Sequence, residues 1–130
     1  MNNAADFYRS KLEFEIDGAD VYEAMNNGEP IVVVDARRSE FYERAHVPGA
    51  INFPHREMNE ESVQRLPKDK LIVTYCDGLG CNASTKAALK LTTFGFRVKE
   101  MPGGMDWWIR DGHPIARGAE VTTGAIACGC

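Results

Sequence analysis

The residues of this sequence with the clearest capacity for chemistry are its four cysteines, which fall into two pairs. Cys76 and Cys81 share one glycine-rich loop, whereas Cys128 and Cys130 lie at the extreme end of the chain. Cys76 stands between an apolar run and a helical pattern, at an expected helix N-terminus where backbone amides lack intrahelical partners and the helix dipole is positive. Both features favour an anion, so we expect a thiolate of lowered pKa at Cys76.

The composition of this loop suits the binding of a negative charge. It reads Cys76-Asp77-Gly78-Leu79-Gly80-Cys81-Asn82. Its glycines allow the backbone to curl so that the amides converge on the sulfur. The same arrangement stabilises a persulfide, Cys–S–S⁻, whose terminal sulfur carries the charge. In the simplest alternative, Cys76 is a small buried hydrophobe that ends a strand.

Alternating strand and helix patterns position this loop. Strands are predicted at residues 31–34, 50–53, 71–75 and 96–101, and helices at residues 17–27, 59–66, 82–94 and 105–109. Asn82 is the expected N-cap of the helix after the loop, and Gly95 its left-handed stop. This order predicts an α/β domain with a small, mainly parallel sheet. Ligands bind outside the carboxyl ends of such strands, which draws attention to Asp35-Ala36-Arg37 and to the Cys76 loop.

Length and charge restrict the classes of protein that fit. The chain has 130 residues, 15 Lys+Arg and 19 Asp+Glu, which gives a formal charge of −4 and the size of one domain. An acidic chain without a basic run argues against a nucleic-acid partner. No apolar run is long enough to cross a membrane, and the N-terminus lacks secretory features, so we expect a cytoplasmic protein. In that compartment paired cysteines are more often catalytic, redox-active or metal-binding than structural.

Several motifs occur in a familiar order. They are Val34-Asp35-Ala36-Arg37, Glu40-Phe41, Ala45-His46-Val47-Pro48-Gly49-Ala50-Ile51-Asn52, Tyr75-Cys76, Gly95-Phe96 and Gly103-Gly104-Met105-Asp106-Trp107-Trp108. In order and spacing this series resembles the rhodanese-like sulfurtransferase family. The resemblance implies a rhodanese fold, with a small, mainly parallel sheet flanked by helices on both faces, at residues 15–116. Residues 1–14 are then an N-terminal extension or helix, and residues 117–130 a C-terminal tail.

The resemblance also implies a reaction. Cys76 would accept sulfane sulfur from a small donor, thiosulfate or a persulfide, and pass it to cyanide, a thiol or a protein acceptor through a Cys76 persulfide. The substrate-binding loop would be residues 77–82, with Asp35 and Arg37 in supporting roles and Glu40 as a further ion-pair partner. No metal or organic cofactor is implied. The alternatives are a persulfide carrier or redox-sensing module with little turnover, and an inactive interaction domain.

The loop departs from the pattern of many family members. These have a shorter loop of the form C-x-x-G-x-R-S, whereas here the alignment puts Ser84 near the family Ser/Thr, leaves two extra residues and provides no Arg or Lys. Asp77 adds a carboxylate that would oppose thiolate formation and repel a doubly charged donor, so we expect weak use of thiosulfate. Phosphatases of this fold use C-x₅-R, but the sixth residue after Cys76 is Asn82, which argues against that activity.

The sequence leaves two roles open for Cys81. It could attack a persulfide or sulfenic acid on Cys76 and form a disulfide, or it could pack beneath the loop and never meet Cys76. Cys128 and Cys130 could act likewise from the tail or belong to a passive C-terminus. A zinc site of all four cysteines is disfavoured by their spacing.

For the histidines and tryptophans, the sequence favours structural roles over chemical ones. His46 is expected to be buried and hydrogen-bonded, His55 is a candidate for the pocket wall, and His113 is expected on an exposed return. Trp107 and Trp108 are expected to provide packing, and the alternative is that one of them borders the pocket.

Overall fold

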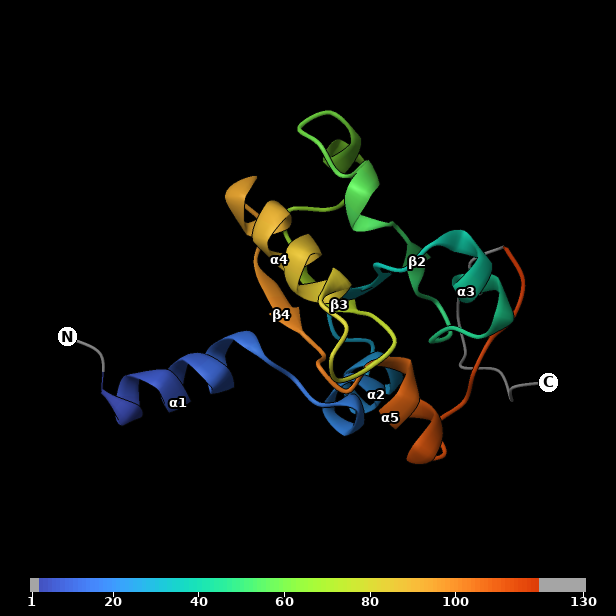
Figure 1. Ribbon diagram of the computed structural model, residues 1–130, viewed down its shortest axis with the longest axis horizontal. Coiled ribbons are helices and arrows are strands. Elements are labelled where there is room, and N and C mark those ends of the chain that lie inside the picture. Colours follow the sequence, from blue (N-terminus) through green and yellow to red (C-terminus); the bar gives the residue numbers. More distant parts are fainter. Residues whose placement is uncertain (1–2, 120–130) are drawn as a thin grey trace.

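The computed structural model describes residues 3–119, which form a parallel β-sheet with helices on both faces (Figure 1). The sheet has four strands in the order β2-β1-β3-β4. Their bounds are β1 (Ile31–Asp35), β2 (Ile51–Asn52), β3 (Leu71–Tyr75) and β4 (Val98–Glu100). All three pairings are parallel, with Val33 opposite Val73 in the centre. The predicted α/β fold with a small parallel sheet is confirmed.

Helical segments cover both faces of this sheet. They are α1 (Ala4–Phe14), α2 (Gly18–Asn26), α3 (Ser39–Arg44), α4 (Ala83–Thr93), α5 (Gly104–Arg110) and the 3₁₀ segments η1 (His55–Glu57) and η2 (Ser62–Arg65). Alternate residues of the strands point to opposite faces. Val34 and Ile72 therefore pack with Leu91 of α4, whereas Val33 and Val73 pack with Trp108 of α5. Burial on both faces explains why β1 and β3 are continuous apolar runs.

Most predicted elements lie where the residue pattern placed them. α2 begins after Asp17, whose side chain accepts a hydrogen bond from the Asp20 amide, and α4 is followed by Gly95 at φ +94°. Asn82 precedes α4 as predicted, but its side chain makes no capping hydrogen bond. The helix predicted at residues 59–66 is only the short η2, although Val63 and Leu66 point inward as expected. The structure adds α3, which was not predicted.

The helix α1 differs from the other α-helices because it buries none of its residues. It extends away from the body of the molecule in Figure 1. The chain joins the sheet directly after it, where the Ile16 amide donates to the Glu100 carbonyl at 2.9 Å. Residues 1–14 thus contain a helix, one of the two forms expected for this segment.

The C-terminal side of the domain returns to the loop after α3. The amide of His46 donates to the carbonyl of Ala116, and that of Ala116 donates to the carbonyl of His46, both at 2.9 Å. The Gly118 amide donates to the Glu43 carbonyl at 2.8 Å. The expectations for Cys128 and Cys130, and for most of the predicted tail, lie outside the described residues. Within residues 3–119 no helix has the length and apolar character to span a membrane.

Candidate active site

The carboxyl ends of β1 and β3 bring the two predicted segments together. Asp35 is the last residue of β1, and Cys76 follows the last residue of β3. The strands stay paired beyond their ends, because the Ala36 amide donates to the Tyr75 carbonyl at 2.9 Å. This edge of a parallel sheet is where ligands bind in open α/β folds. The structure therefore brings Asp35, Arg37 and the Cys76 loop together at this edge of the sheet.

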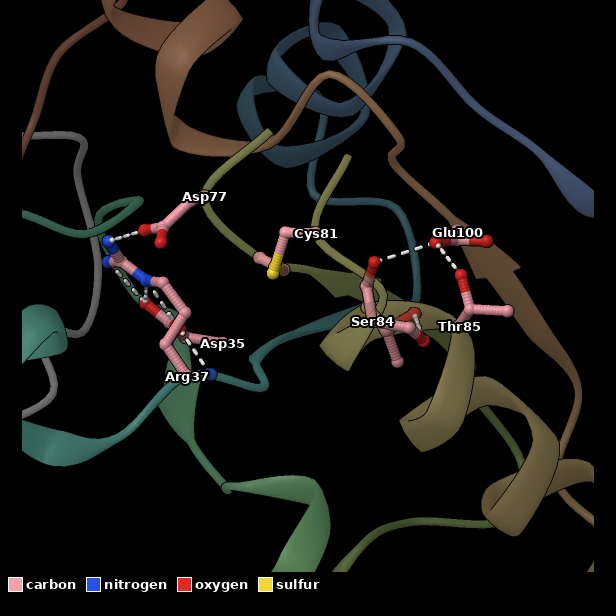
Figure 2. The surroundings of a disulfide bond; sticks show 9 residues. Asp35, Arg37, Asp77, Cys81, Ser84, Thr85 and Glu100 are labelled. Carbon is pink, nitrogen blue, oxygen red and sulfur yellow. Dashed lines mark hydrogen bonds and ion pairs between the residues drawn. A yellow bond between two sulfur atoms is a disulfide. The ribbon is translucent and has the colours of Figure 1, made fainter. Parts of the chain in front are cut away.

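Cys76 is buried, with 1% of its surface exposed, and it is joined to Cys81 by a disulfide bond (Figure 2). The two Cα atoms are 6.4 Å apart, within the usual span of a disulfide. The interpretation in which Cys81 never meets Cys76 is therefore wrong. In this state neither sulfur is a nucleophile, so the loop is seen in an oxidised form that must be reduced before Cys76 can react.

The first half of the loop, Cys76–Gly78, is anchored against the start of α5. The Met105 amide donates to the Cys76 carbonyl at 3.0 Å, and the Asp106 amide donates to the Asp77 carbonyl at 2.8 Å. Such close approach requires glycine at position 104, where φ is +59° and a Cβ atom would lie 2.7 Å from the Gly78 nitrogen. The Gly103-Gly104 pair thus fixes the backbone beside Cys76.

The second half, Leu79–Asn82, has fewer contacts. Its Cys81 amide donates to the Gly78 carbonyl at 3.2 Å, which closes a turn, and Gly80 adopts φ +90° with open space around it. The Leu79 side chain is 73% exposed. Within the described part of the chain, the amides of Gly78, Leu79 and Gly80 donate no hydrogen bond. Leu79 and Gly80 are exposed, so their amides are open to a bound anion, whereas Gly78 is buried.

A buried ion pair lies beneath the anchored half of the loop. Asp35 is fully buried, and the Arg37 side chain, 8% exposed, donates to it through Nε at 3.0 Å and Nη2 at 2.8 Å. The Tyr75 hydroxyl donates to the same carboxylate at 2.7 Å. Burial opposes the charge of Arg37, yet its hydrogen bonds to Asp35 and the carboxylate charge raise the pKa of Arg37 above its ordinary value. Burial, followed by the charge of Asp35, raises the pKa of Tyr75.

Asp77 also belongs to this network. Its carboxylate accepts a hydrogen bond from Nη1 of Arg37 at 3.0 Å, as Figure 2 shows, while 60% of its side chain remains exposed. Arg37 is shared between Asp35 and Asp77, so the three side chains together keep one net negative charge beside the loop. The carboxylate that the sequence adds beside Cys76 is therefore paired but not neutralised. Glu40 does not extend the network: it pairs with Arg38 at 3.2 Å.

A shallow pocket of about 210 Å³ borders the loop on the side of Cys81. Its wall contains Cys81, Asp77, His55 and the cationic side chains of Arg37, Arg38 and Arg56. Burial, and then the charges of Lys90, Lys86 and Arg56, lower the pKa of His55. His55 was a predicted wall residue, whereas Arg38 and Arg56 were missed because they lie on segments outside the loop. The loop itself lacks cations, but the pocket beside it does not.

The N-terminus of α4 already holds a carboxylate. Glu100, at the end of β4, accepts hydrogen bonds from the Ser84 hydroxyl at 2.6 Å and the Thr85 hydroxyl at 2.7 Å (Figure 2). Nothing in the local sequence around Glu100 indicated this contact, because β4 and α4 meet only in the folded chain. A further negative charge thus lies near the loop, in addition to that of Asp77.

The remaining residues singled out in the sequence are structural. His46 is buried, stacks on Tyr42 at 3.7 Å between ring centres, and donates from Nδ1 to the Tyr42 carbonyl at 2.7 Å. His113 was expected to be exposed, but it packs against Tyr22 and Trp108 at 4.8 and 4.6 Å. Trp108 is buried in the core, and Trp107 borders the depression on the other side of the loop.

No group of three or more potential metal ligands gathers within residues 3–119. The disulfide also occupies the two cysteines of the loop, and a disulfide sulfur is not the thiolate that binds zinc. The tail cysteines of the disfavoured four-cysteine zinc site lie outside this part of the chain.

Comparisons with known proteins agree with this architecture. The family model of the rhodanese-like domain matches residues 18–111. The chain is 43% identical in sequence to the solved BH2092 protein of Bacillus halodurans, with a TM-score of 0.82 over 95% of this chain and 88% of that one. It is 28% identical over 101 residues to a sulfurtransferase of Allochromatium vinosum, covering 78% of this chain and 92% of that protein.

A further relative is a larger protein. The chain is 36% identical over 94 residues to the HTH-type transcriptional regulator Rv0324 of Mycobacterium tuberculosis, which covers 72% of this chain but only 41% of the regulator. The chain thus spans less than half the length of that relative. The fold, the ordered motifs around the sheet edge and the family match over residues 18–111 lead to one assignment: the chain belongs to the rhodanese-like domain family.

Proposed function

We propose that the reduced protein is a sulfurtransferase that moves sulfane sulfur from a donor to an acceptor through a persulfide on Cys76. The observation that carries the proposal is the placement of Cys76 directly after β3 and before α4, in a loop with unpaired amides at the carboxyl edge of the sheet. The sulfurtransferase of Allochromatium vinosum supports this assignment as a relative over most of its length.

The reaction consists of two displacements. With thiosulfate, the Cys76 thiolate attacks the outer sulfur, the sulfur–sulfur bond of the donor breaks, and sulfite leaves with the electron pair. An acceptor, cyanide or a thiolate, then attacks the outer sulfur of the persulfide and restores the Cys76 thiolate. The oxidation state of the protein is the same before and after the cycle, so the two displacements need no external oxidant or reductant.

The backbone around Cys76 supports both steps. The anchored half of the loop fixes the position of the sulfur, while the amides of Leu79 and Gly80 offer donors to the charge on thiolate, persulfide or donor. Such preorganised donors stabilise developing charge without reorganisation during the reaction. The Arg37–Asp77 ion pair weakens, but does not remove, the repulsion that Asp77 exerts on a negative charge at Cys76.

The choice of donor follows from the cations. Arg37 is committed to two carboxylates, and Glu100 adds a negative charge at the start of α4, so the loop has no free cation for the double charge of thiosulfate. We infer a preference for persulfide donors over thiosulfate. The cations Arg38 and Arg56 lie outside the loop, in the wall of the neighbouring pocket. Thiosulfate should then be used with a kcat/KM below about 10⁶ M⁻¹s⁻¹, and a higher value contradicts this preference.

A multiple-turnover transfer assay on reduced protein tests the function. With a thiol in excess as the acceptor, sulfur transfer should occur over many cycles in the wild type and be lost in Cys76→Ser. The double variant Cys128→Ser/Cys130→Ser is the matched control and should transfer at the wild-type rate. Full activity of Cys76→Ser contradicts the proposal, and persulfide loading of the wild type without turnover identifies a carrier instead of an enzyme.

A further inference from the structure

We propose that Cys81 is a second catalytic residue, which attacks the Cys76 persulfide and releases its outer sulfur as hydrosulfide. This inference rests on the proposed function, because it requires the persulfide to form. It adds a reductive activity to the sulfur transfer: one sulfane sulfur is reduced, and the loop cysteines are oxidised to the disulfide that the structure contains.

The geometry of the loop allows the two sulfurs to meet. The separation of five residues is closed by the turn in which the Cys81 amide donates to the Gly78 carbonyl, and the positive φ of Gly80 lets the chain reverse. The first half of the loop stays fixed by α5, so the position of Cys76 is set independently of its partner. Cys81 belongs to the half that is held mainly by that turn and the disulfide itself.

The step balances in atoms and electrons. The Cys81 thiol gives its proton to the charged outer sulfur of the persulfide, and its thiolate attacks Sγ of Cys76. A bond forms between the two cysteine sulfurs, the bond to the outer sulfur breaks, and the outer sulfur leaves with the electron pair as hydrosulfide. The sulfane sulfur gains two electrons, which the two cysteines lose. A second acceptor is therefore not needed for this turnover, but a thiol reductant is needed to restore the loop.

The structure also indicates which of the two cysteines an external thiol attacks when the disulfide is reduced. Cys76 is 1% exposed, whereas the partly exposed Cys81 is part of the pocket wall formed with Arg38 and His55. An external thiolate therefore reaches Sγ of Cys81 more readily than Sγ of Cys76. The departing group is then the Cys76 thiolate, which lies directly after β3 in the loop whose exposed amides are unpaired. Two thiols, or one dithiol, complete the reduction and return Cys76 ready to accept sulfur.

A single-turnover experiment tests the step. Both proteins carry Cys128→Ser/Cys130→Ser so that no tail thiol can react, and one of them also carries Cys81→Ser. After reduction and removal of reductant, each receives one equivalent of a glutathione persulfide donor. The Cys81-containing protein should release one hydrosulfide per chain and end as the disulfide. Cys81→Ser should release none and retain about 32 Da of added mass on Cys76.

The outcomes separate the two proposals. If neither protein gains mass or releases hydrosulfide, the proposed function itself fails. If both proteins hold a stable persulfide on Cys76, the sulfur-transfer function stands and the role of Cys81 is wrong. Hydrosulfide release by Cys81→Ser at the rate of its parent also contradicts that role.

A separate measurement identifies the cysteine that an external thiol attacks first. Oxidised protein treated with glutathione should form a mixed disulfide on Cys81, found by fragmenting peptide 71–86, which contains both loop cysteines and no internal Lys or Arg. Glutathione on Cys76 instead would overturn the proposed attack at Cys81.

Discussion

The two halves of the Cys76 loop differ in how the fold holds them. Cys76–Gly78 is bonded to the backbone of α5 and lies over the buried Asp35–Arg37 pair, whereas Leu79–Asn82 is largely exposed and is joined to the first half by one turn and the disulfide. The difference separates two tasks. A nucleophile must be held in place, and a cysteine that bonds to it and leaves again must be able to move.

The largest expected effect comes from the buried ion pair that lies beneath the first half of the loop. Arg37→Met keeps much of the side-chain volume but leaves the fully buried Asp35 without its cation, and should lower the free energy of unfolding by about 3–5 kcal/mol. Asp77→Asn removes only the exposed arm of the same network and should lower it by about 1 kcal/mol or less. Urea unfolding of both variants measures this, and equal losses would contradict the division between buried and exposed arms.

The glycines give a second contrast. A Cβ atom at Gly104 would lie 2.8 Å from the Asp77 carbonyl carbon at a positive φ, whereas one at Gly80 has the positive φ but open space. Gly104→Ala should therefore destabilise by about 2–5 kcal/mol and Gly80→Ala by about 1–2 kcal/mol. Thermal unfolding of the oxidised proteins compares them. A larger effect at Gly80 would show that the second half, not the first, is the rigid one.

A smaller loss of stability is expected from the Tyr75 hydroxyl, which belongs to the buried network beneath the anchored half of the loop. Its hydroxyl donates to Asp35 at 2.7 Å and accepts from the Val47 amide at 3.1 Å, both in buried surroundings. Tyr75→Phe removes both bonds and should destabilise by about 1–3 kcal/mol, without changing the number of loop thiols that react after reduction. A change within about 0.5 kcal/mol, measured by chemical unfolding, would remove this hydroxyl from the anchoring network.

The smallest expected effect is the pH dependence contributed by His46. Burial lowers the pKa of His46, so below about pH 6.5 the unfolded chain binds a proton that the folded protein resists. Stability from this residue is complete above that pH and falls as the pH drops toward the lowered pKa, by at most about 1.4 kcal/mol per pH unit. Comparing the wild type with His46→Gln by urea unfolding at pH 7.5 and 5.5 isolates it. An equal pH dependence in the two proteins would contradict the assignment.

The sequence predicted the parts of this site that depend on local pattern. β1 and β3 are apolar runs because both of their faces are buried, and this also located Asp35 and Cys76 at the strand ends. The pairing of Arg37 with Asp77 was beyond local pattern, since it joins residues 40 positions apart and depends on β1 lying beside β3. For the same reason the contact of Glu100 with Ser84 was missed.

Two further differences concern short segments, α3 and the turn at His113. The six residues of α3 are too few for a helical period to show in the sequence. His113 was expected to be exposed because it stands in a Gly-His-Pro turn, but the chain folds back so that its ring meets Tyr22 and Trp108. In both cases tertiary packing decides what a short polar or mixed segment does.

The central claim is that Cys76 carries the transferred sulfur. The most direct measurement is the mass of peptide 71–86 from reduced Cys81→Ser protein, before and after a persulfide donor and again after cyanide. The account predicts a gain of about 32 Da on Cys76 that cyanide removes, with no gain in the Cys76→Ser/Cys81→Ser variant. Absence of the gain on Cys76, or an equal gain in the protein that lacks Cys76, would contradict it.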